Sequence, residues 1–141
     1  MYLLDTVVLS ELRKRRRNEH LVEWITTVAD SDLHVSVATI VEIERGIELQ
    51  RNVDAAFAQQ LARWFDVTLR AYGERILPMT VAIARRWGQL AAQIGNRELD
   101  LAIAATALEH GLTVVTRNVS HFAPTGAGTL NPFEPHRQER K

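Results

Sequence analysis

The sequence contains no cysteine, which excludes disulfide scaffolds, thiolate metal sites and cysteine nucleophiles together. Only four prolines and seven glycines occur among 141 residues, too few for a collagen-like or low-complexity chain. Basic and acidic residues number 17 each, so no net charge draws the protein onto nucleic acid or an anionic membrane. Any contact with nucleic acid must therefore be local.

Long apolar runs are also missing, as are internal repeats, Gly/Ser linkers and the glycine-rich loops that bind nucleotides. The five histidines include no pair at the four-residue spacing of a helical zinc site. We therefore expect one domain without a membrane span, since about 100–150 residues commonly form a single core.

Short apolar segments alternate with longer amphipathic ones along the chain. Five segments are predicted strands: residues 2–4, 33–37, 76–78, 112–115 and 129–130. Apolar spacing predicts helices around residues 57–65 and 83–94 with their aromatic residues in the core, Thr80 as an N-cap and Gly111 as a C-cap. This alternation predicts a three-layer α/β/α domain with a central, mainly parallel sheet. We expect the domain to occupy residues 1–133 and a polar tail to occupy residues 134–141.

Four polar residues follow predicted strands or begin predicted helices. They are Asp5, Glu42, Asp100 and Asn118. In a parallel sheet, strand ends and helix starts meet at one edge, where ligands bind. Carboxylates that converge there repel one another unless a cation lies between them, and hard oxygen ligands favour Mg²⁺ or Mn²⁺. The pattern therefore predicts a metal site that acts on a phosphoryl substrate.

Each of these residues also has a simpler structural interpretation. Thr39 and Glu42 match a capping box, in which the Glu side chain reaches back to the Thr amide. Asp100 could be an N-cap, and Asn118 could be a turn residue with left-handed geometry. Asp5 could cap a helix, although the threonine after it is an equally good candidate. The basic run Arg13–Arg17 could bind RNA phosphates or could simply be a solvated helix end.

Three segments carry a resemblance to a known family. They read YLLDTVVLSELRK, VSVATIVEIERGIEL and LDLAIAATALEHGLTVVTRNVSHF, and LNPF follows near the end. Together they resemble PIN-domain ribonucleases, particularly VapC-type toxins of bacterial toxin–antitoxin pairs with a FitB-like pattern. The likeness runs from Met1 to about Phe133. It implies that the catalytic metal ligands are Asp5, Glu42 and Asp100.

The chain departs from the family pattern at the fourth acidic position. Asn118 follows Thr116 and Arg117, where some members have aspartate, and His121 stands where others have aspartate before phenylalanine. One firmly held metal ion is therefore expected, and a second stays open. We expect Thr6, Thr116 and Asn118 to orient water or metal by hydrogen bonds.

The resemblance implies a metal-dependent endoribonuclease toxin of the bacterial cytoplasm, with Mg²⁺ or Mn²⁺ as cofactor. It also implies a homodimer, inhibition by a cognate VapB-like antitoxin, and contact with DNA only through that antitoxin.

Two other functions stay open at this stage. The first is a catalytically weak PIN-fold binding module that acts through its antitoxin complex, which Asn118 and His121 make conceivable. The second is a response-regulator receiver, which also gathers acids at strand ends. A receiver requires adjacent acids early and a lysine late in the core, whereas the only lysines here are Lys14 and Lys141.

Overall fold

The protein is described by a computed structural model that covers residues 1–96 and 98–135. A central five-stranded sheet has the order β3-β2-β1-β4-β5, and every neighbouring pair is parallel. The strands are β1 (Tyr2–Leu4), β2 (Leu33–Ser36), β3 (Ile76–Leu77), β4 (Thr113–Val115) and β5 (Thr129–Leu130). The predicted parallel sheet is confirmed, and all five predicted strands are present.

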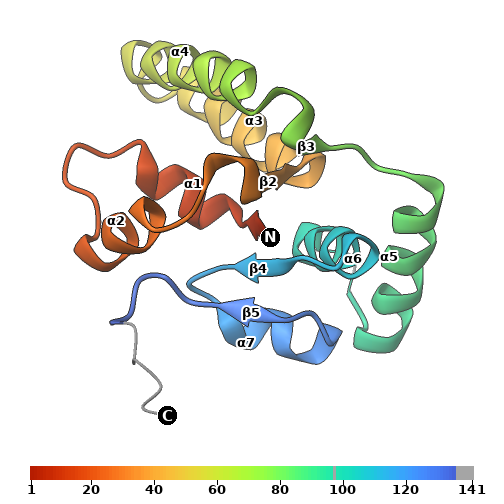
Figure 1. The fold of residues 1–141 in the computed structure, drawn as a ribbon. Helices are drawn as coiled ribbons and strands as arrows, with labels where there is room; N and C mark the ends of the chain where they lie inside the picture. The colour runs from red at the N-terminus through yellow and green to blue at the C-terminus, as the bar shows by residue number, and fades with distance from the viewer. Residues whose placement is uncertain (97, 136–141) are drawn as a thin grey trace.

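The helices cover both faces of this sheet (Figure 1). They are α1 (Thr6–Leu12), α2 (Glu19–Thr26), α3 (Val37–Arg51), α4 (Ala55–Tyr72), α5 (Val81–Ile94), α6 (Leu99–His110) and α7 (Val119–Phe122). Short 3₁₀ turns cover Asp30–Asp32, Gly73–Arg75 and Ala123–Thr125.

Consecutive strand residues point into two separate cores. Leu3 and Val114 belong to a cluster built with α5, α6 and α7, whereas Leu4 and Val115 belong to a cluster built mainly with α1 to α4. This alternation follows from the period of two in a strand. The predicted three-layer α/β/α architecture is therefore confirmed.

Local chemistry explains where the elements begin and end. Strand β2 stops one residue earlier than predicted because Val37 already begins α3, and β3 stops before Pro78, which lacks an N–H donor. The Thr80 side chain accepts a hydrogen bond from the Ile83 amide, so the predicted N-cap of α5 is confirmed. Gly111 ends α6 at a left-handed φ of 66°, as predicted.

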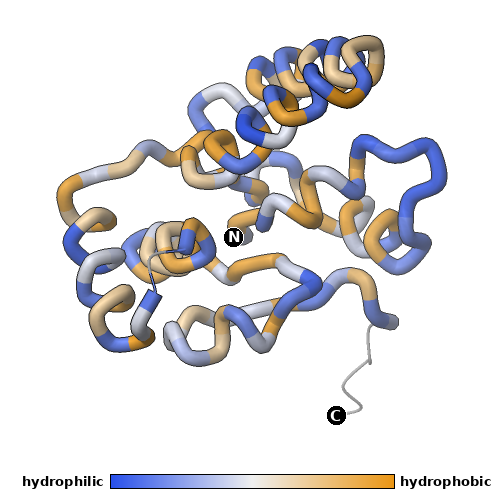
Figure 2. The backbone as a smooth tube through the Cα atoms, turned by 180° about the vertical axis from the view of Figure 1, so that it is seen from behind, coloured by the Kyte–Doolittle hydropathy of each residue, from blue (hydrophilic) through white to orange (hydrophobic). Residues whose placement is uncertain are grey.

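Helix α4 lies in an outer position, packed on α3, and its tube alternates hydrophobic and hydrophilic residues (Figures 1 and 2). It buries Phe65, but Phe57 and Trp64 are only half-buried, as is Trp87 on α5. The prediction that these aromatic residues lie in the core is confirmed for Phe65. Trp64 and Trp87 are half-buried but pack against the two core clusters, whereas Phe57 belongs to neither cluster. The apolar stripe of α4 is only partly covered, because this helix packs mainly on α3.

Of the tail predicted at residues 134–141, only Glu134 and Pro135 are among the described residues, and both are exposed. Residues 136–141 lie outside them. Across residues 1–96 and 98–135, no helix is both long enough and apolar enough to cross a membrane.

Candidate active site

Asp5 is a buried carboxylate at the carboxyl end of β1, with 3% of its surface exposed. Its Oδ1 accepts a hydrogen bond of 2.7 Å from the Thr6 amide, so Asp5 itself caps α1. Its Oδ2 accepts a hydrogen bond of 2.8 Å from the Thr116 hydroxyl, and the Asn118 amide donates to Thr116 Oγ1 at 2.9 Å. Two strand ends therefore hold this carboxylate in one orientation.

Glu42 lies on the second turn of α3 and faces the start of α1. The Thr6 hydroxyl donates to Glu42 Oε1 at 3.1 Å, and Thr39 Oγ1 lies 3.3 Å from the same hydroxyl. The capping-box interpretation is wrong, because α3 begins earlier: Ser36 is the N-cap and accepts from the Ala38 amide. Glu42 is therefore free of any capping role.

Asp100 is the second residue of α6, next to the N-terminus of the helix. Interpretation of Asp100 as an N-cap is wrong, since Glu98 occupies that position and makes no side-chain capping bond. The Asp100 Oδ2 atom lies 3.5 Å from His121 Nδ1, with 27% of the Asp100 side chain exposed. His121, which stands where some members of the family have aspartate, therefore lies beside the carboxylate of Asp100.

These side chains line one pocket of about 380 Å³, which we call the acidic pocket. Its lining residues are Asp5, Thr6, Val7, Ser10, Glu11, Lys14, Glu42, Asp100, Arg117, Asn118 and His121. All four residues that the sequence placed at the sheet edge therefore meet there. Asn118 has a φ of −99°, so it is not a left-handed turn residue, and its side chain does not cap α7.

Two carboxyl groups of the acidic pocket, those of Asp5 and Glu42, have raised pKa values. Burial raises the pKa of Asp5, and the charge of Asp100 raises it further against the opposing hydrogen bonds from Thr116 and Thr6. Burial likewise raises the pKa of Glu42, and the charges of Asp100 and Asp5 add to that effect. A cation in the pocket would relieve this repulsion.

The donor set suits a hard divalent cation, because carboxylates of Asp5, Glu42 and Asp100 line the acidic pocket together with Asn118. The fourth lining carboxylate, Glu11, is paired with Lys14. Among the described residues, no three His, Asp or Glu side chains already stand at ligating separation. Glu42 and Asp100 are more exposed than Asp5. Asp5 would be the most firmly held ligand, because hydrogen bonds from Thr6 and Thr116 orient its carboxylate.

Comparison with known proteins shows the family of this chain. Residues 2–123 match the family described as the PIN domain. The chain belongs to the PIN domain family. It is 32% identical to the toxin FitB of Neisseria gonorrhoeae, over 94% of this chain and 99% of that one. It is also 32% identical to the VapC ribonuclease Y4jK of Sinorhizobium fredii, over 96% and 99% of the two chains.

A solved structure leads to the same family. The crystal structure of FitAcB from Neisseria gonorrhoeae superposes with a TM-score of 0.82 at 32% identity, covering 94% of this chain and 99% of that chain. The five-stranded parallel sheet with its helices is thus the PIN-domain fold.

A second hollow of this PIN domain, which we call the apolar groove, adjoins the acidic pocket. It measures about 240 Å³ and shares Thr6, Ser10 and Glu42 with the pocket, while Phe57 and Trp64 of α4 contribute aromatic surface. Sequence reasoning missed this groove because it assigned both aromatic residues to the core.

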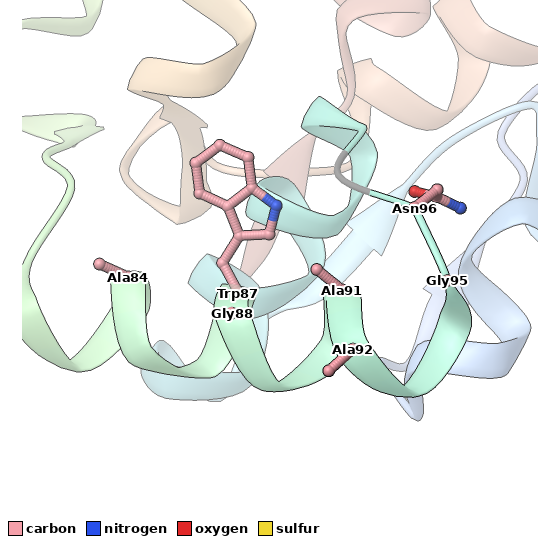
Figure 3. Close-up of a pocket in the computed structure, with 7 residues that line it drawn as sticks. All are labelled: Ala84, Trp87, Gly88, Ala91, Ala92, Gly95 and Asn96. Carbon is pink, nitrogen blue, oxygen red and sulfur yellow. The ribbon is translucent and has the colours of Figure 1, made fainter.

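A larger hollow lies elsewhere in the PIN domain, along α5, and holds about 630 Å³ (Figure 3). Small residues and Asn96 line it, and none of its lining residues is charged. Figure 3 shows Trp87 rising from α5, and its ring packs against the core cluster built with α6. Because it offers no acid, base or nucleophile, this hollow is not a candidate for catalysis.

The basic run after α1 is partly engaged in local contacts. Lys14 forms an ion pair of 2.8 Å with the buried Glu11, Arg13 lies over the Phe57 ring, and Arg17 donates to the Lys14 carbonyl. Only part of this run is therefore available to bind a ligand.

Proposed function

We propose that this PIN domain, spanning residues 1–133, is a Mg²⁺- or Mn²⁺-dependent endoribonuclease that acts as the toxin of a type II toxin–antitoxin pair. The observation that carries the proposal is the acidic pocket, where Asp5, Glu42 and Asp100 meet and where burial, together with like charge, raises the pKa of Asp5 and of Glu42. The names of the relatives FitB, a toxin, and Y4jK, a VapC ribonuclease, support the same activity.

Asp5, Glu42 and Asp100 would hold the ion. When bound, such an ion activates a water molecule and neutralises charge on the phosphoryl oxygens of RNA. Thr116 and Thr6 hold the carboxylates of Asp5 and Glu42 in place by hydrogen bonds of 2.8 and 3.1 Å. The backbone amide of Asn118 extends this support, because it donates a hydrogen bond to Thr116 Oγ1.

Incubation of the purified full-length protein with total RNA tests the activity. We expect internal cuts in the presence of Mg²⁺ or Mn²⁺ and none in EDTA. Glu42→Gln is the matched control, because its amide oxygen can still accept from Thr6 while the anionic ligand is lost. Intact RNA with the wild-type protein and metal, or equal cutting by Glu42→Gln, would refute the proposal.

The alternative function is a catalytically weak binding module. It stays open because neither Asn118 nor His121, the two candidates for a further acidic ligand in the acidic pocket, is a carboxylate. That module would still bind its antitoxin while leaving RNA intact. The same RNA incubation separates the two functions.

The proposed partner is a VapB-like antitoxin encoded beside this protein, which blocks the acidic pocket and provides the only contact with DNA. The apolar groove beside Glu42 gives a polypeptide a surface that continues into the pocket. A homodimer and action in the bacterial cytoplasm complete the proposal, and copurification of the two chains followed by light scattering checks the assembly.

A further inference from the structure

Arg117 and Phe133 are brought together by the sheet. Arg117 lies two residues beyond β4, and Phe133 lies three residues beyond β5, which pairs in parallel with β4. The Thr116 amide donates to the Leu130 carbonyl at 2.9 Å and continues this pairing past the strand ends. Both side chains therefore emerge at the carboxyl edge that carries the acidic pocket.

The Arg117 side chain is held over an aromatic ring. Its guanidinium carbon lies 3.9 Å from the centroid of the Phe133 ring. Phe133 is itself 8% exposed, and its amide donates to Asn131 Oδ1 at 2.9 Å, so the ring is a fixed support. Contact through the face of a guanidinium leaves its in-plane N–H donors available for an acidic oxygen.

Among the described residues, no acidic side chain occupies those donors. Within residues 1–96 and 98–135, Arg117 takes part in no ion pair and donates no side-chain hydrogen bond, although it lines the acidic pocket. The other cation on this side, Lys14, is neutralised by Glu11. The charge of Arg117 also contributes to the lowered pKa of Glu11, behind the hydrogen bond from Lys14, which places the guanidinium on that side of the pocket.

A polyanionic substrate needs such a group here. The acidic pocket repels phosphates through Asp5, Glu42 and Asp100, the lining carboxylates other than the paired Glu11. The protein has no net charge that would offset this repulsion at long range. A planar guanidinium matches a phosphate with two parallel N–H donors, which an ammonium group cannot do.

We propose that Arg117 binds a backbone phosphate of the RNA next to the three acids, and that Phe133 is a positioning residue that orients its guanidinium. This inference rests on the proposed ribonuclease function. The competing explanation is that the Arg117–Phe133 contact only anchors the segment after β5 to the sheet.

Binding of a 12-nucleotide fluorescein-labelled single-stranded RNA, followed by fluorescence anisotropy over a NaCl series with Mg²⁺, separates the two. Full-length Glu42→Gln protein is the parent, so that the probe stays uncut. Three further substitutions are introduced separately into this parent protein: Arg117→Gln, Arg117→Lys and Phe133→Leu. Arg85→Gln is the matched control, because Arg85 is exposed on α5 outside the acidic pocket and its loss changes the net charge equally.

Arg117→Gln should weaken binding about tenfold at low salt, as expected for loss of a charge-assisted contact. Its slope of log affinity against log salt should become shallower by roughly 0.7, the value for one lost phosphate contact to a single strand. Arg117→Lys and Phe133→Leu should bind RNA more weakly than the parent. Their slopes should equal that of the parent, because the positive charge at position 117 remains. Arg85→Gln should match the parent.

Melting curves of each variant complete the experiment. Unchanged affinity and slope in Arg117→Gln, with a lower melting temperature, would mean that the contact only anchors the chain. The same slope change in Arg85→Gln, or no binding by the parent, would also overturn the inference. Cleavage of the same RNA by the protein with Glu42 intact reports on the ribonuclease function separately, so failure of one proposal is distinguishable from failure of the other.

Discussion

The Thr116 hydroxyl donates a hydrogen bond of 2.8 Å to Asp5 Oδ2 across 111 residues of sequence. Both side chains are buried, and they follow strands β4 and β1, which pair in parallel. Thr116 Oγ1 also accepts from the Asn118 amide, so one hydroxyl connects the acid of the first strand with the loop after the fourth. A buried carboxylate oxygen is thereby satisfied without a cation.

Replacement of Thr116 with valine tests this hydrogen bond, because valine keeps the shape and removes the hydroxyl. We expect the free energy of unfolding to fall by about 1–3 kcal/mol, since a buried carboxylate oxygen and an amide lose their partner. Thr116→Ser should stay close to wild type. Urea unfolding of the metal-free proteins measures both, and equal stability of the Val and Ser variants would show that this bond contributes nothing.

Glu42→Gln should be more stable than wild type in EDTA at neutral pH. The pKa of Glu42 is raised in the folded protein, so the folded state binds the proton more tightly than the unfolded chain. This contribution to stability is complete below the ordinary value of 4.5 and is lost as the pH rises through the raised pKa. Glutamine does not titrate and avoids the loss.

Melting temperatures from pH 4 to pH 8 follow this effect. The advantage of Glu42→Gln over wild type should grow with pH in EDTA and reverse when Mg²⁺ is added, because only the wild type gains a ligand–metal bond. A constant difference across the pH range would argue against a raised pKa of Glu42 in the folded protein.

Asn118→Asp should bind divalent cations more tightly than wild type. Asn118 lines the acidic pocket, so aspartate would add a fourth hard anionic oxygen there. The same charge should lower stability in the absence of metal, because it increases repulsion among the acids. A Mn²⁺ titration followed by melting temperature reads both effects, and identical curves for the two proteins would place residue 118 outside the metal site.

Growth arrest should depend on the acidic pocket. Induced alone in a bacterium, the wild-type protein should stop growth, whereas Glu42→Gln at the same expression level should not. Coexpression of the neighbouring open reading frame should restore growth. Colony counts and an immunoblot check these outcomes, and equal arrest by both proteins would point to an activity other than RNA cleavage.

The sequence by itself determined the five strands and most of the acidic pocket. Asp5, Glu42 and Asp100 could be found because each stands within a few residues of a strand end or a helix start, and those boundaries follow from local hydrophobic spacing. Parallel strands then bring their carboxyl ends to one edge. Thr80 and Gly111 were predictable for the same reason, since capping depends on neighbouring residues only.

Only the tertiary structure decided how those residues are used. Whether Asp5 or Thr6 caps α1 depended on the Thr6 hydroxyl, which turns toward Glu42 on another helix. The half-exposure of Phe57 and Trp64 depended on how α4 packs against α3. The contact of Arg117 with Phe133 depended on β5 pairing beside β4. Such contacts join residues far apart in sequence, and they arise from strand order and layer packing, which no local pattern encodes.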